Sequence, residues 1–361
     1  MEDTLIYTKL YATIFIDAIA FLILIKKQKF FFNHNILYIL ILFILILWHS
    51  CFFSFKQEES ILDSLKGIFV IFSIVFSTSL IKINVLIKLY KNILQISTLC
   101  ILISSDLLLI THPESAYYGN LFQGIYANPN SLALCISVLL MPYYINNIFN
   151  VKSKYLHEKV ILINLFIILF LTGSRTGLLV SVIILIIVLL KNYKSTKLKH
   201  LILGTLIGFI LIVFSNNFID FIDKGNKDSL LTTRSMLYEN RIEGIYTRPY
   251  TGWGYQVNEF HYADEHNDFK QLEKGNTYLA LIEEFGLFLG PIIIIILIKI
   301  YLNSLKLNTE LYFISLIILA SLIHSNSETW IFIMHGNSGI AFWMSVIIMY
   351  RLIKKVALEH K

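Results

Sequence analysis

The sequence predicts an all-α, polytopic membrane protein with about eleven transmembrane helices and one long, partly helical extracytoplasmic loop. Hydrophobic residues make up 56% of the 361 residues and charged residues only 15%, whereas a soluble domain carries about 25% charged residues. The apolar runs are continuous stretches of Leu, Ile and Phe, without the alternation typical of outer-membrane barrel strands. Backbone groups in hydrocarbon must pair within their own segment, so we expect these runs to be helices.

The apolar runs divide the chain into three expected regions. Residues 1–214 hold the first eight helices, residues 215–279 form the large extracytoplasmic loop, and residues 280–361 hold the remaining helices. The sixth and seventh spans are separated only by Gly173-Ser174-Arg175, which predicts a tightly turned pair. The expected spans are residues 5–25, 36–55, 61–81, 92–110, 129–149, 160–172, 176–190, 198–214, 280–303, 310–323 and 333–352.

Lysine marks every second connection between these spans. Lys82, Lys88 and Lys91, for example, fall between the third and fourth spans, and the chain ends on a further basic cluster. Because lysine-rich loops stay in the cytoplasm, this alternation predicts a multi-pass protein of the cell membrane with its N-terminus outside and its C-terminus in the cytoplasm.

Composition also argues against several kinds of site. Cys51, Cys100 and Cys135 all lie in apolar runs, so neither a disulfide framework nor a metal site is expected, and we expect no cofactor. The net charge of +6 is spread over short loops, which indicates lipid headgroups and not nucleic acid as the partner. The 215–279 loop carries many aromatic residues and charges of both signs, and we expect it to form a folded cap.

Arginine is used differently from lysine in this chain. Of the five arginines, Arg175, Arg234, Arg241 and Arg248 fall on the expected outer face, against the topological bias. A guanidinium pairs with phosphate through two parallel hydrogen bonds, which an ammonium cannot do. Solvated loop charges, or partners for nearby acidic residues, are the alternative interpretation. The pattern otherwise indicates an outward-facing anion site.

The spacing of these arginines predicts a shared helix face. Arg234, Arg241 and Arg248 recur every seven residues, which returns a helix to nearly the same face. Pro249 ends this helix. Arg175 lies at the N-terminal end of the seventh span, where free N–H groups and the helix dipole favour an anion. A lipid-linked pyrophosphate would suit such an array.

Polar residues also stand at the expected start of the fifth span. In Asn128-Pro129-Asn130, Asn128 is placed to cap the fifth span, with Pro129 at the first helical position. These residues fit either a plain helix start or a polar edge of the anion site, and both interpretations stay open.

Four stretches together resemble the O-antigen ligase and the O-antigen and capsular polysaccharide polymerase family. They are Gly124-Ile-Tyr-Ala-Asn-Pro-Asn-Ser-Leu-Ala133, Leu171-Thr-Gly-Ser-Arg-Thr-Gly-Leu178, Arg234 through Pro249-Tyr-Thr-Gly-Trp-Gly254, and Gly275-Asn-Thr-Tyr-Leu-Ala-Leu-Ile-Glu-Glu-Phe-Gly286 continuing to Gly290. The resemblance implies a metal-independent glycosyltransferase that uses an undecaprenyl-pyrophosphate-linked glycan outside the cytoplasm.

The resemblance also assigns expected site residues. It implies that Arg175 and Arg234 hold the donor pyrophosphate, and the spacing adds Arg241. The family pattern has a histidine where this chain has Gly275, so the general base is open, with His266, Glu273 and His261 as candidates in that order; the two histidines also fit plain surface positions. We expect the substrate-binding side chains to be Ser174, Asn128, Asn130, Arg248 and Asn276, and His324, Glu328 and His335 to line the acceptor path or cap helices.

These observations favour a polymerase that joins undecaprenyl-pyrophosphate-linked repeat units, as donor and acceptor, into capsular or O-antigen polysaccharide. A ligase that transfers finished polymer to a lipid or protein is the first alternative. A lipid-linked oligosaccharide flippase or transporter is the second, and it would need more ionisable residues in mid-membrane than Asp17 and Asp106. Other polysaccharide export proteins are possible partners of the enzyme.

Overall fold

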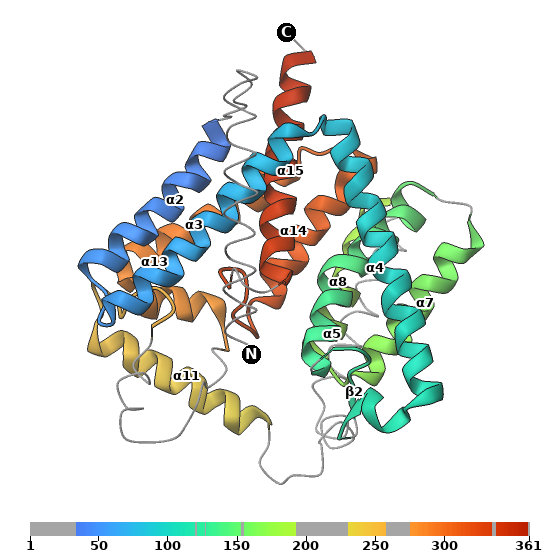
Figure 1. The fold of residues 1–361 in the computed structure, drawn as a ribbon, viewed down its shortest axis with the longest axis horizontal. Coiled ribbons are helices and arrows are strands. Elements are labelled where there is room, and N and C mark those ends of the chain that lie inside the picture. The colour runs from blue at the N-terminus through green and yellow to red at the C-terminus, as the bar shows by residue number, and fades with distance from the viewer. Residues whose placement is uncertain are drawn as a thin grey trace. The chain divides into compact units, whose positions relative to one another are not determined.

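The computed structural model describes residues 34–119, 121–126, 128–152, 155–192, 230–257, 275–333 and 337–359. The described chain is almost entirely helical and forms two compact units (Figure 1). Unit 1 comprises Met1–Lys88, Met236–Asn303 and Glu328–Lys361, and unit 2 comprises Leu89–Ser235 and Ser304–Ser327. Each unit therefore combines segments that are far apart in the sequence.

Unit 1 is built mainly from long helices. The helices are α2 (His34–Phe52), α3 (Gln57–Leu80), most of α11 (Leu230–Thr247), most of α13 (Thr277–Ser304) and α15 (Asn337–Glu359). α2 and α3 form a hairpin whose facing sides bury small hydroxyl residues, with the Ser50 and Ser64 Oγ atoms 2.7 Å apart. Such hydroxyls satisfy one another inside apolar surroundings, which allows two apolar helices to approach closely.

Arginine 351 ties α15 to the end of α3. Its guanidinium donates to the carbonyl oxygens of Thr78 and Ile81, the latter at 2.9 Å. Carbonyls at a helix C-terminus have no partner within the helix, and a cation near them is favourable. The single arginine expected on the cytoplasmic face is thus a helix cap.

Unit 2 surrounds a helical stretch that contains two π-helical turns. It holds most of α4 (Ile83–Thr111) together with the remaining elements, listed in order as η1 (Pro113–Ala116), β1 (Tyr117–Tyr118), β2 (Leu121–Phe122), α5 (Pro129–Cys135), η2 (Ile136–Leu140), α6 (Met141–Ile145), η3 (Asn146–Asn150), α7 (Leu156–Leu171), α8 (Arg175–Asn192), η4 (Thr309–Leu311) and α14 (Tyr312–His324). β1 and β2 pair antiparallel, with Tyr117 opposite Phe122. The π turns flank α6, whose Pro142 has no N–H to continue a regular ladder.

The helices support the expected class of membrane protein. Five described helical stretches are long and apolar enough to cross a membrane: Gln57–Leu80, Ile83–Thr111, Pro129–Asn150, Arg175–Asn192 and Thr277–Ser304. The chain is a multi-pass, nearly all-α membrane protein. The expected total of about eleven spans is not confirmed, and the spans at 5–25 and 198–214, with residues 215–229 and 258–274 of the loop, lie outside the described residues.

One boundary differs from its prediction for a clear reason. α4 begins at Ile83 and not near residue 92, so Lys88 and Lys91 lie in its first turns and not in a loop. Only Ile81 and Lys82 connect α3 to α4. Lysine has a good helix propensity and its long stem can carry the charge to the interface, so lysines do not end a helix.

Candidate anion site and the packing of the outer motifs

The turn before α8 is shaped by its own polar side chains. The Thr172 hydroxyl donates to the Leu169 carbonyl at 2.7 Å and accepts from the Ser174 N–H at 3.3 Å. Gly173 has a φ of 64°, a conformation that favours glycine. Ser174 then caps α8, because its Oγ accepts from the Gly177 N–H at 3.2 Å. The expected tight turn between the sixth and seventh spans is therefore present.

Arg175 is the first residue of α8, and its guanidinium is only partly satisfied by the described residues. Its Nε and Nη2 atoms are buried, and no residue in the described part of the chain accepts a hydrogen bond from them. A buried guanidinium without an acceptor is costly, and a bound anion would remove that cost. The position at a helix N-terminus adds the favourable end of the helix dipole.

The 124–133 stretch packs directly beside this turn in unit 2 (Figure 1). A Cβ atom added to Gly173 would lie 2.7 Å from Leu121, and one added to Gly177 would lie 3.4 Å from the Ala133 Cβ. The first two stretches of the family resemblance are therefore neighbours in space. The glycines permit the approach that brings the start of α5 beside the start of α8.

Asn128 caps the start of α5, as the sequence predicts. Its Oδ1 accepts from the Ser131 N–H at 2.7 Å, and Pro129 follows at the first helical position. Asn130 is exposed on the first turn. Tyr126 lies just before the cap, and burial raises the pKa of its phenol. The start of α5 thus offers a capped helix end with one free amide side chain, Asn130, near the turn that carries Arg175.

Arg241 and Arg248 contact other side chains of unit 1. Arg241 is 3% exposed and forms an ion pair with Glu283 of α13, which is 1% exposed. The Arg248 guanidinium lies 4.9 Å from the Phe55 ring centroid and 5.0 Å from that of Trp253. α11 ends at Thr247, so Arg248 lies just beyond the helix and not on a helix face shared with Arg241. The side chain of Arg234 lies outside the described structure although its backbone is helical.

The turn after α11 is joined to α13 through backbone hydrogen bonds. Trp253 and Gly254 donate from their N–H groups to the carbonyls of Glu283 and Glu284, at 3.0 and 2.8 Å, and Leu287 donates to Pro249 at 2.8 Å. These bonds replace helix bonds that α13 lacks where Gly286, with a φ of 72°, breaks it. The third and fourth stretches of the resemblance thus form one packed element.

The loop between α2 and α3 completes this element, and sequence reasoning missed its role. Phe55 donates its N–H to the Trp253 carbonyl at 2.8 Å, and a Cβ atom added to Gly254 would lie 2.0 Å from the Ser54 Oγ. The His49 Nε2 lies 2.6 Å from the Thr251 carbonyl. The position of His49 near the end of an apolar run was the only feature of the sequence that could have indicated its contact with Thr251.

Three of the five expected substrate-binding side chains are helix caps. Besides Ser174 and Asn128, Asn276 caps α13, because its Oδ1 accepts from the Tyr278 and Leu279 N–H groups at 2.8 and 3.1 Å. Within the described part of the chain, Asn130 and Arg248 remain the members without such a role. His261, His266, Glu273 and His335 fall outside the described residues, His324 is buried in α14, and the Glu328 carbonyl accepts from Thr277.

The described residues also bear on metal chemistry. They contain no group of three or more His, Cys, Asp or Glu side chains placed to hold a metal ion. The cation in this part of unit 2 is instead Arg175 itself. The arrangement can bind and neutralise an anion, and it holds neighbouring helix ends with short caps.

The structure describes a multi-pass helical membrane protein with a partly unsatisfied arginine at a helix N-terminus. Residues 160–294 match the model of the O-antigen ligase family, which confirms the resemblance stated above. The matched range includes the start of α13 and the arginines Arg175, Arg234, Arg241 and Arg248. No curated protein matches the chain. The match indicates a membrane enzyme of the O-antigen ligase or polymerase type, acting on lipid-linked glycans.

Proposed function

We propose that the chain is a polysaccharide polymerase. It joins undecaprenyl-pyrophosphate-linked repeat units on the extracytoplasmic face into capsular or O-antigen polysaccharide. The observation that carries the proposal is Arg175, whose buried Nε and Nη2 atoms lack an acceptor in the described structure and which lies at a helix N-terminus within the family match.

The main catalytic requirement of this reaction is to stabilise the negative charge of the departing pyrophosphate. The acceptor hydroxyl attacks the anomeric carbon of the donor, the bond from that carbon to the pyrophosphate oxygen breaks, and the pyrophosphate leaves with the electron pair. A fixed guanidinium placed where this negative charge grows lowers the barrier. We assign this role to Arg175 and Arg234. Both residues belong to unit 2, which includes Leu89–Ser235.

The remaining expected residues take supporting roles in the proposal. Arg241 is paired with Glu283, so we assign it to holding α11 against α13. The hydroxyl proton of the acceptor passes to a base in the extracytoplasmic loop, with His266 and Glu273 as the candidates. The transfer is proposed to use no metal or cofactor, and export proteins are proposed to receive the polymer.

A ligase is the second candidate, because the matching family model is that of O-antigen ligases. The two candidates differ only in the acceptor. A polymerase null strain accumulates single lipid-linked repeat units, whereas a ligase null strain accumulates finished lipid-linked polymer.

The test is the size distribution of surface polysaccharide and lipid-linked intermediates in a deletion strain. The strain is complemented with wild type, Arg175→Ala or Arg175→Lys, with Lys66→Ala as the control, since Lys66 forms only a local pair with Asp63. We expect Arg175→Ala to lower the rate about 10²- to 10³-fold and to leave single repeat units. Normal polymer length at normal protein level would refute the role of Arg175, and intermediates trapped on the cytoplasmic leaflet would indicate a flippase.

A further inference from the structure

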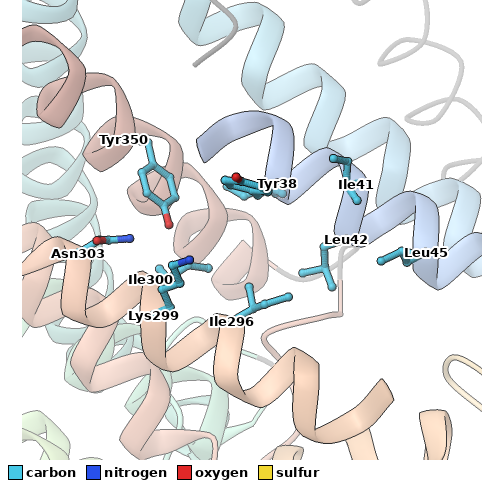
Figure 2. A pocket seen from close by; sticks show the side chains of 10 residues that line it. Tyr38, Ile41, Leu42, Leu45, Ile296, Lys299, Ile300, Asn303 and Tyr350 are labelled. Atoms are coloured by element: carbon cyan, nitrogen blue, oxygen red, sulfur yellow. The ribbon is translucent and has the colours of Figure 1, made fainter. Parts of the chain in front are cut away.

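Unit 1 contains a groove that the proposed reaction does not use. It lies along α2 and α13 and reaches α15, and it encloses about 170 Å³ (Figure 2). A cavity of about 150 Å³ holds a molecule the size of benzene. The groove therefore accommodates part of a hydrocarbon chain and is too small for a glycan.

The two ends of the groove differ in polarity. Figure 2 shows Lys299, Asn303 and Tyr350 gathered at one end, and Leu42 and Leu45 toward the other. Lys299 is exposed, and its Nζ lies 5.9 Å from the centroid of the Tyr38 ring. No acidic side chain of the described chain lies within ion-pair distance of this ammonium.

The polar end lies far along α13 from the packed turn. Lys299 and Glu283 are separated by 16 residues of α13, which corresponds to on the order of 20 Å. The polar end is also formed by Tyr350, the neighbour of the Arg351 that caps α3. By the distribution of lysines this is the end expected at the cytoplasmic leaflet. The apolar walls continue for about 10 Å along α2 from Tyr38 to Leu45.

We propose that this groove binds an anionic phospholipid of the cytoplasmic leaflet. The headgroup phosphate pairs with Lys299, and one acyl chain lies against Leu42, Leu45 and Ile296. A lysine at the membrane surface attracts anionic lipid, and a tyrosine beside it suits the headgroup region. A net-neutral phospholipid would satisfy the apolar walls equally well but would gain less from the ammonium, so charge selects the lipid.

Photo-cross-linking tests the occupant directly. Leu45 is replaced by p-benzoylphenylalanine in the full chain, which is placed in nanodiscs of equal parts phosphatidylcholine and phosphatidylglycerol. After irradiation, mass spectrometry identifies the lipid adducts by their mass. Leu45 is 41% exposed, so the replacement leaves the core of unit 1 intact. We expect the phosphatidylglycerol adduct to predominate.

Charge variants then separate the headgroup contact from general lipid contact. Lys299→Gln should lower the ratio of phosphatidylglycerol to phosphatidylcholine adducts about fivefold, and Lys299→Arg should preserve it. Lys306→Gln, at an exposed lysine outside the groove, should leave the ratio unchanged. Equal adducts of the two lipids, an unchanged ratio in Lys299→Gln, or cross-links only to the chain itself or to a second copy would overturn the proposal.

Discussion

Arg241 and Glu283 allow the role of an outer-face arginine to be measured. Both side chains are almost fully buried, at 3% and 1% exposure, and they pair with each other across α11 and α13. Arg241→Met leaves the Glu283 carboxylate without its charge partner, and breaking a buried pair in this way costs about 3–5 kcal/mol. Glu283→Leu should cost a similar amount by removing the carboxylate that pairs with the buried guanidinium.

The double variant Arg241→Met/Glu283→Leu should be close to wild type in stability. It replaces the pair by apolar side chains of similar size, an exchange that is often neutral because two desolvation costs disappear with the attraction. Unfolding titrations in mixed micelles measure all four proteins, with tryptophan fluorescence as the signal. The reasoning is refuted if either single variant costs less than about 1 kcal/mol, or if the double variant is as unstable as the singles.

The same double variant separates packing from chemistry. If Arg241 only holds α11 against α13, cells carrying the double variant should make polymer of normal length. If the double variant is stable but makes none, Arg241 acts on the substrate, as its seven-residue spacing from Arg234 and Arg248 first suggested.

Three further substitutions test individual contacts by the same unfolding titration. Gly254→Ala should lower the free energy of unfolding by about 1–3 kcal/mol, because φ is 112° and the new Cβ would meet Ser54. The loss should be larger than that of the control Gly119→Ala, where φ is 59° but no atom lies within 4 Å of the new Cβ. Asn128→Ala should cost about 1 kcal/mol and Asn128→Asp very little, because aspartate also caps. Tyr255→Phe removes a 2.5 Å hydrogen bond to the Phe332 carbonyl and should cost about 1–2 kcal/mol; no loss would mean the bond is absent.

Periodicity and local chemistry account for what the sequence predicted well. Continuous apolar runs located most of the described apolar helices, and Asn128-Pro129 marked a helix start. Pro249 marked the end of α11, which stops at Thr247, before Arg248. Each of these features depends on residues within a few turns of one another. Local signals of this kind are the ones a single sequence carries.

Partners distant in sequence could not be predicted. Nothing near Arg241 indicates that Glu283 would neutralise it, or that Phe55, far toward the N-terminus, would stack on Arg248. Polar residues at helix starts were also ambiguous, because an asparagine that caps a helix and one that binds a substrate have the same local sequence. Hydrogen-bond geometry shows that Ser174, Asn128 and Asn276 cap helices, and substrate binding by the same side chains stays a prediction.

The break in α13 at Gly286 has a practical consequence for building chimaeras. Residues 249–254 supply the hydrogen-bond partners that the interrupted helix lacks, so these residues and the start of α13 are one structural part. A loop transplanted from a relative with a junction between them would leave polar backbone groups unsatisfied near the membrane. Exchanges of acceptor specificity should therefore carry residues 249–287 as a single cassette, with the Ser54-Phe55 turn matched to it.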